Sequence, residues 1–140
     1  MSDAGDATAA RAARTALVAA AREFNAGRYF EAHEALEEAL EDVPDDCWRL
    51  FLGLIQVAVG YHKVTQELWT GAARMLEIGL AKLASEPDGA RGVALGALRA
   101  RAGSDLELLR AGRFDQRGFA ASPPRLVLRP AFARPTRKPG

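Results

Sequence analysis

The sequence predicts an all-α protein, a compact bundle of about five to six helices followed by an extended, proline-rich segment. Strand-like alternation of apolar and polar residues is missing from residues 6–121, where Ala, Leu, Glu and Arg dominate. The breaks in this region fall at Gly and Pro, with helical spacing between them. Because the chain has 140 residues and 49% of them are apolar, one compact domain is expected.

The first two predicted helices form a hairpin. A helix over about 6–26 carries one apolar face, and Gly27 supplies the left-handed conformation at which helices often end. A second helix is expected over about 29–43, with Pro44 ending it. The stripe of this helix that should be buried comprises Tyr29, Ala32, Leu36, Ala39, Leu40 and Val43.

The third predicted helix, over about 47–66, is the most apolar and therefore the central one. Asp45 or Asp46 is expected to cap its N-terminus. Apolar side chains cover most of its circumference. Gly53 and Gly60 lie two turns apart on the remaining strip, so we expect a neighbouring backbone to approach closely there.

The next elements are predicted from Gly and Pro punctuation. A fourth helix is expected over about 70–84, and the run 86–89 then breaks the chain. A weaker helix follows over about 90–102 and stops at Gly103. Ser104 opens a capping-box pattern, which predicts a short further helix to about Ala111.

The charge is distributed unevenly between the helical body and the tail. Residues 1–121 hold 14 Lys and Arg against 18 Asp and Glu, a net charge of −4, whereas residues 122–140 hold five basic residues and no acidic one. Five of the seven prolines also lie in 122–140. We therefore expect a single helical domain over 6–121 and a basic tail over 122–140. The tail should be partly strapped to the bundle through 123–128, or disordered.

A candidate polar cluster lies on the second and third helices. His33 and Glu37 are four residues apart, so they share a helix face and can hydrogen-bond or hold one ion together. His62, the other histidine, falls inside the apolar arc of the central helix. If these helices pack side by side, Glu34 or Glu37 reaches His62. Further candidate members are Tyr29 and Gln56. The competing interpretation is a buried polar network that only fixes helix packing.

The chemistry of this cluster leaves an enzymatic reading open. A divalent metal needs converging imidazole nitrogens and carboxylate oxygens, which His33, Glu37 and His62 would supply. With Glu34 as a further catalytic candidate, the cluster would then belong to a metal-dependent hydrolase or a related enzyme. The zinc-protease motif is excluded because Glu37 stands where that motif has its second His. No glycine-rich nucleotide-binding motif is present either.

At these residues the chain resembles the small all-helical prokaryotic proteins called domain of unknown function 309. The resemblance spans roughly 17–85 and is carried by the block 24–37 (F-N-A-G-R-Y-F-E-A-H-E-A-L-E), by 53–56, by His62 and by 71–72. It departs from the family pattern at Leu40, at Leu52 and at the pair 67–68. The family implies a helical fold and no assigned reaction. Its motif falls here on Asn25, Gly27, Tyr29, Glu31, His33, Glu34, Glu37, Gln56 and His62. Among these, Asn25, Tyr29, Glu31 and Gln56 are binding or polar-network candidates.

The leading functional interpretation is a binding or interaction module for a protein or small-molecule partner. One alternative is the metal-dependent enzyme described above. A second alternative is a tetratricopeptide-like scaffold that binds peptides, because 27–29, Ala32 and Leu36 resemble one unit of that repeat. A near-copy at 71–73 lies about 40 residues after Ala32 rather than 34, and no third copy is visible.

Two partner classes are disfavoured. The five basic residues of the tail accompany a single aromatic residue, Phe132, which is a weak pattern for nucleic acid. No stretch is long and apolar enough for a membrane span, and residues 1–24 lack the apolar core of a signal peptide. Because Cys47 is the only cysteine, no disulfide framework exists, and we expect a cytoplasmic protein.

Overall fold

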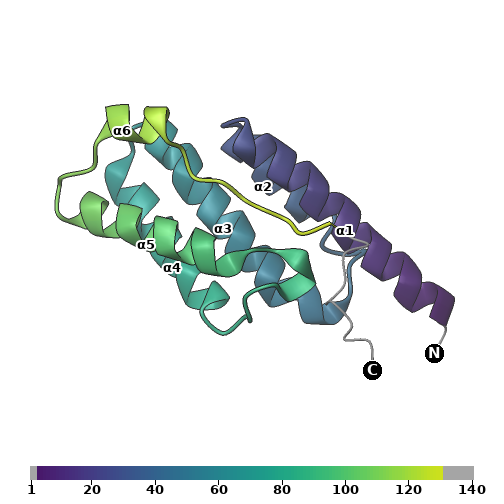
Figure 1. Cartoon of the computed structure of the whole chain (residues 1–140). Helices are drawn as coiled ribbons and strands as arrows, with labels where there is room; N and C mark the ends of the chain where they lie inside the picture. The colour runs from purple at the N-terminus through teal and green to yellow at the C-terminus, as the bar shows by residue number, and fades with distance from the viewer. Residues whose placement is uncertain (1–2, 131–140) are drawn as a thin grey trace, which may run out of the picture.

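The computed structural model describes residues 3–130, and this part of the chain is all-α, as the composition predicts. Figure 1 shows the helices packed side by side with an extended segment across them. The α-helices are α1 (Asp3–Asn25), α2 (Tyr29–Glu38), α3 (Trp48–Thr65), α4 (Trp69–Leu83), α5 (Leu95–Arg110) and α6 (Gln116–Ala121). Two short 3-10 helices, η1 (Asp45–Cys47) and η2 (Ala90–Gly92), precede α3 and α5.

The helices form hairpins that stack in chain order. Helix α1 pairs with α2, and α3 with α4, while α2 packs on α3 and α4 packs on α5. Helix α3 therefore lies at the centre, as expected, and carries a long series of buried residues. Phe51, Val57 and Tyr61 are completely buried there. Burial of these apolar side chains is the main source of stability for such an array.

Helix α2 is shorter than the sequence suggests, ending at Glu38 instead of near 43. After Glu38 the backbone N–H groups of Ala39 and Leu40 bond to the carbonyls three residues earlier, each at 3.2 Å, so the chain tightens into turns before it reaches Pro44. The predicted cap of α3 is also wrong. Neither Asp45 nor Asp46 caps that helix, and its N-cap residue, Cys47, makes no side-chain cap bond. Asp46 instead accepts a hydrogen bond from Arg91 at 3.0 Å.

The C-terminal helices are arranged differently from the prediction. Gly103 does not end a helix, because α5 runs through it without interruption and residues 90–92 belong to η2. Ser104 therefore caps no new helix, and the neighbouring Asp105 side chain is buried in the core, where it accepts a hydrogen bond from Tyr61. Helix α6 was not predicted. Its N-cap residue is Asp115, whose carboxylate accepts a hydrogen bond from the backbone N–H of Arg117 at 3.1 Å.

The close approach expected at Gly53 and Gly60 is confirmed, and the approaching helix is α4. A Cβ atom at Gly53 would lie 2.6 Å from Leu83 Cδ2, and one at Gly60 would lie 2.8 Å from Leu76 Cδ2. Gly79 on α4 completes the contact, since its Cβ would lie 2.8 Å from the carbonyl oxygen of Gly53. Glycines on both helices thus allow the backbones of α3 and α4 to meet.

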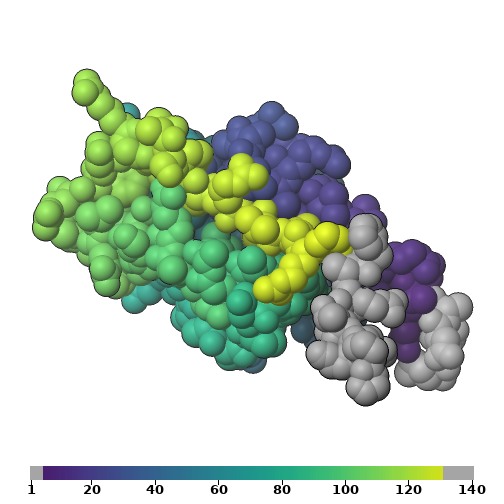
Figure 2. Space-filling view, viewed as in Figure 1, coloured from purple at the N-terminus to yellow at the C-terminus, as the bar shows by residue number. Residues whose placement is uncertain are grey.

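Residues 123–129, hereafter the strap, cross the helices as an extended segment. In Figure 2 the strap is the yellow band between the purple and blue surface of the first hairpin and the green surface of α5. Leu126 is buried, and the backbone N–H groups of Ala94 and Arg129 bond to the carbonyls of Val127 and Gly92 at 2.9 and 2.8 Å. The remaining tail expected to trail, 131–140 with Phe132, lies outside the described residues. No helix of the described part could cross a membrane.

Candidate functional site

The two histidines meet on either side of a phenylalanine ring. Phe30 and His33 stand one turn apart on α2, and His62 lies in the last turn of α3. The Phe30 ring centroid lies 4.8 Å from that of His33 and 5.2 Å from that of His62. Phe30 is 43% exposed and His62 is half-buried rather than part of the sealed core. The predicted pairing of α2 with α3 therefore brings both imidazoles to one surface.

The orientation of the His33 ring is set by its own helix. Its Nδ1–H donates to the carbonyl oxygen of Phe30 at 2.7 Å. Its Nε2 then lies 3.5 Å from Glu37 Oε1, a contact that is an ion pair only when the ring is protonated. The Glu37 side chain is 62% exposed, so water screens this contact strongly.

The remaining members of the sequence cluster do not converge into a metal site. Within residues 3–130, no group of three or more His, Cys, Asp or Glu side chains is placed to hold a metal ion, so His33, Glu37 and His62 do not form a ligand set. Glu34 is half-buried on α2, whereas Glu31 is exposed beside Phe30 and His62 in a shallow depression.

Two other candidates lie elsewhere. The Gln56 side chain on α3 has a buried Oε1 without a hydrogen-bond partner in the described part of the chain. Tyr29 belongs to the core and not to the imidazole surface, because it is 3% exposed and its ring lies 5.6 Å from that of Tyr61. Tyr29 and His33 therefore lie in different surroundings, the core and the imidazole surface, although both are on α2.

A buried polar network joins α3 to α5. Tyr61 Oη–H donates to Asp105 Oδ2 at 2.6 Å, and Arg101 Nε–H donates to the same oxygen at 2.9 Å. Asp105 is 5% exposed, so the guanidinium group and the phenol together compensate its lost hydration. Truncating one member would leave a buried group unpaired, which identifies this network as a packing determinant.

Burial also affects the pKa values of Tyr61 and of Tyr29, whose ring lies beside that of Tyr61. Desolvation raises the pKa of Tyr29 to about 12, opposed by the nearby Arg101. Desolvation and the carboxylate of Asp105 both raise the pKa of Tyr61 far above its ordinary value. Both phenols therefore stay neutral at physiological pH, and neither is a general base.

Sequence reasoning missed this network because Asp105 was taken only as an inner residue of the capping-box pattern that Ser104 opens. Two signals were present. Arg101 and Asp105 are four residues apart, the spacing of an intrahelical ion pair. Tyr61 lies in the most apolar part of α3, where a phenolic O–H needs a partner.

The connections that follow α1, α3 and α5 share the same backbone turn. Each contains a residue with left-handed backbone, namely Gly27 with φ 82°, Glu67 with φ 60° and Gly112 with φ 68°. In each, the N–H of this residue donates to the carbonyl three residues earlier, and the next N–H donates to the carbonyl five residues earlier. This is the Schellman pattern of helix ends. Since the sequence shows no third copy, the third turn is a finding of the structure.

An aromatic residue stands two positions after each left-handed residue. These residues are Tyr29, Trp69 and Phe114. Phe114 lies 5.8 Å from Trp69 and 5.5 Å from Phe119, and Phe119 lies 6.3 Å from Tyr29, measured between ring centroids. The three turns therefore gather at one end of the array around a common aromatic cluster. Their spacings of 40 and 45 residues differ from the 34 of tetratricopeptide units.

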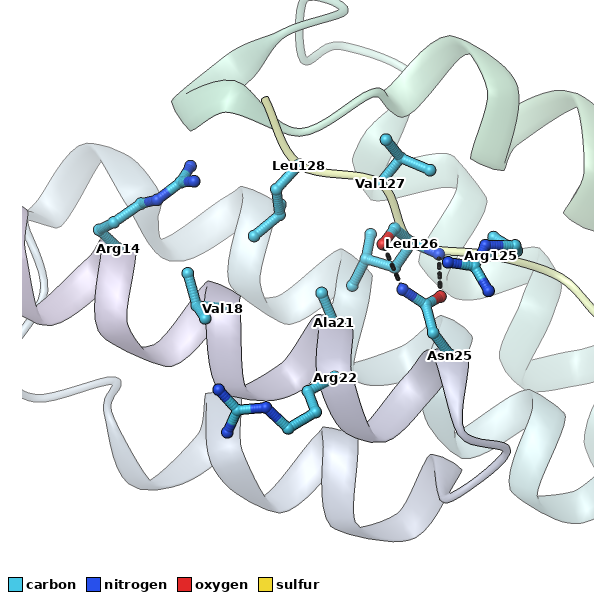
Figure 3. A pocket seen from close by; sticks show the side chains of 9 residues that line it. All are labelled: Arg14, Val18, Ala21, Arg22, Asn25, Arg125, Leu126, Val127 and Leu128. Atoms are coloured by element: carbon cyan, nitrogen blue, oxygen red, sulfur yellow. Dashed lines mark hydrogen bonds between the residues drawn. The ribbon is translucent and has the colours of Figure 1, made fainter. Parts of the chain in front are cut away.

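The side chain of Asn25 binds the backbone of the strap, as Figure 3 shows. The Asn25 Nδ2–H donates to the carbonyl oxygen of Leu126 at 3.0 Å, and Asn25 Oδ1 accepts from the N–H of Leu126 at 2.7 Å. One carboxamide thus satisfies both backbone groups of a residue 101 positions away. The sequence placed Asn25 among the binding candidates but gave no partner for it.

A groove of about 420 Å³ runs between α1 and the strap. Its α1 wall carries Arg14, Val18, Ala21, Arg22 and Asn25, and its other wall is formed by 125–128. No carboxylate of the described residues forms an ion pair with Arg14, Arg22 or Arg125. The groove is therefore cationic, in a helical body of net negative charge.

The fold and this groove define an all-α array of helical hairpins that holds an extended segment by its backbone. Residues 17–75 match the family model described as Domain of unknown function (DUF309). No curated protein and no solved structure matches the chain. The matched segment includes Asn25, His33 and His62 but ends before Asp105 and the strap.

Proposed function

We propose that the protein is a binding module whose hairpin array holds extended chain segments between α1 and α5. The space that the strap fills there is hereafter called the channel, and it is distinct from the cationic groove between α1 and the strap. The observation that carries the proposal is the two-bond contact of Asn25 with the backbone of Leu126. Because the Asn25 carboxamide bonds only to a backbone N–H and C=O, this contact recognises the extended backbone of a segment and is independent of its side chains. The strap is then the occupant that the chain itself supplies.

The contacts on the opposite side of the strap support the same function. Val127 and Arg129 pair with the backbone around Val93, which gives the strap the hydrogen bonding of a short antiparallel bridge. The side chain of Leu126 is 3% exposed and belongs to the hydrophobic core, so it anchors the strap on the apolar floor beneath it. Main-chain pairing with one apolar anchor is the mode by which many domains bind extended peptides.

A metal-dependent hydrolase is not proposed, because His33, Glu37 and His62 do not converge. The protein resembles tetratricopeptide scaffolds in having stacked helical hairpins and an extended segment bound to them. It differs in the spacing of its turns, which is 40 and 45 residues instead of 34.

The test uses the full chain with a weakened strap. Leu126→Glu places a carboxylate in the apolar floor and should release the strap from the channel. A fluorescein-labelled peptide with the strap sequence, Pro-Pro-Arg-Leu-Val-Leu-Arg, is then titrated and its fluorescence anisotropy measured. We expect stoichiometric binding to this variant and at least about tenfold weaker binding to the unmodified chain. The tethered strap competes there at an effective concentration in the millimolar range.

Two further variants make the result specific. Asn25→Ala combined with Leu126→Glu should weaken peptide binding about tenfold, because two backbone hydrogen bonds are lost. Val127→Glu changes a side chain that is 47% exposed, so this variant should bind the peptide as poorly as the unmodified chain. A folded Leu126→Glu variant that binds no peptide, or binds it regardless of Asn25, would contradict the proposal.

A further inference from the structure

We propose a second binding site, the cationic groove between α1 and the bound strap, and its occupant is an extended peptide segment with acidic side chains. This site needs the strap in place, since 125–128 form one of its walls. It is therefore independent of whether the strap can be exchanged.

The first argument is charge. Arg14 stands near one end of the groove and Arg125 near the other, as Figure 3 shows, and neither forms an ion pair with a described carboxylate. Guanidinium groups bind carboxylates in a planar, two-bond geometry. Because the arginines are spaced along the groove instead of meeting at a point, they suit separate carboxylates of one extended ligand.

The second argument is the free backbone edge of the strap. Alternate residues of an extended segment direct their N–H and C=O groups to the same side. Those of Leu126 point to α1, where Asn25 binds them, so those of Leu128 point to that side as well. Within the described part of the chain, no hydrogen bond uses the N–H or C=O of Leu128. A second extended segment could pair with them, whereas a helix has no free backbone groups to offer.

The third argument is the length and lining of the groove. Arg14 and Asn25 lie eleven positions apart on α1, a distance of about 16 Å along the helix axis. An extended segment of about five residues covers this distance. Val18 and Val127, 37% and 47% exposed, offer apolar contacts between the charged ends. No aromatic side chain lines the groove, so bases of a nucleic acid would find no stacking platform.

The probe is a fluorescein-labelled peptide with the core Glu-Val-Ser-Val-Glu, whose two glutamates lie four residues apart on one side when extended. Binding to the unmodified full chain is measured by anisotropy at low salt, and ¹⁵N NMR shifts locate the site. We expect amide shifts at Val18 and Leu128, and a binding constant that weakens with added salt. Replacing both glutamates of the probe by Gln should abolish binding.

The decisive variant is Arg14→Ala combined with Arg125→Ala, which should weaken binding about tenfold, the sum of two exposed ion pairs. Arg74→Ala combined with Arg113→Ala removes the same charge from exposed positions outside the groove and should leave binding within twofold. Circular dichroism checks that both variants are folded. The charge-reversed pair Arg14→Glu and Arg125→Glu should bind the probe with Lys in place of Glu.

Four results would overturn the proposal. They are no binding to the unmodified chain, equal loss in both double variants, a doubled molecular mass that puts a second copy in the groove, and stronger binding of a single-stranded oligothymidine at the same amides. None of them bears on strap exchange, which is tested with Leu126→Glu.

Discussion

Asp105 is the single buried charged side chain among residues 5–130, and its charge adds to the effect of burial, which is the larger cause of the raised pKa values of the two nearby tyrosines. Tyr61 and Arg101 share one of its oxygens, and Tyr29 lies close enough for its charge to matter. A tyrosine with a folded pKa above its unfolded value holds its proton more tightly in the folded state. The stability gained in this way is fully present below the unfolded pKa and is lost as the pH rises beyond it.

This arrangement predicts an unusual alkaline titration. The chain contains two tyrosines, Tyr29 and Tyr61, so absorbance near 295 nm reports on them alone. We expect little tyrosinate at pH 10, the ordinary value, and ionisation of Tyr29 near pH 12 if the fold persists. The free energy of unfolding should fall as the pH rises above 10, less steeply in Tyr29→Phe. Half-ionisation at pH 10 with native circular dichroism would disprove this.

At the scale of single elements, replacing a helical glycine by alanine should have opposite effects on stability at Gly79 and at Gly103. Gly79→Ala should lower the free energy of unfolding by about 1–3 kcal/mol, because its Cβ would meet the backbone of Gly53 and Val57 and force α3 and α4 apart. Gly103→Ala should raise it by about 0.5–1 kcal/mol, since this helical position has open space around it. Urea denaturation of both variants measures the contrast, and equal effects would be inconsistent with it.

The sequence predicted the central elements better than their ends. Apolar periodicity gave α1, α3 and α4 nearly to their bounds, and Gly27 marked the first turn. Glu67 gave no such signal for the second turn, because a non-glycine residue at φ 60° is rare and its conformation follows from the surrounding helices. Gly103 and Ser104 imitated a helix boundary, and tertiary contacts of Asp105 overrode that local preference.

The candidate site was predictable to a similar degree. The packing of α2 on α3 follows from the short connection between them, and it places His33 and His62 on either side of the Phe30 ring. The partner of Asn25 could not be inferred, since it lies 101 residues away in a segment without helical periodicity. Polar residues that bind distant backbone carry no pattern in the sequence around them.

At the scale of the whole molecule, the strap joins the first hairpin to the chain before α5. Asn25→Ala leaves the N–H and C=O of Leu126 without these bonds and should cost about 1–3 kcal/mol in stability. Hydrogen exchange measured residue by residue should show faster exchange at Leu126 and Arg129. Exchange in α3 around Val57 should become faster only by the amount that the lower free energy of global unfolding accounts for. Unchanged exchange at Leu126 would mean that Asn25 does not hold the strap.

The distance in sequence between Asn25 and Leu126 also has a consequence for biosynthesis. Helices α1 to α4 can pair through contacts between neighbouring elements while the chain is still being made, because such contacts have a small loop-closure cost. The strap cannot occupy the channel beside α1 until Leu126 has emerged from the ribosome. A nascent chain therefore passes through an interval in which the hairpins are formed and the channel is open to other extended segments.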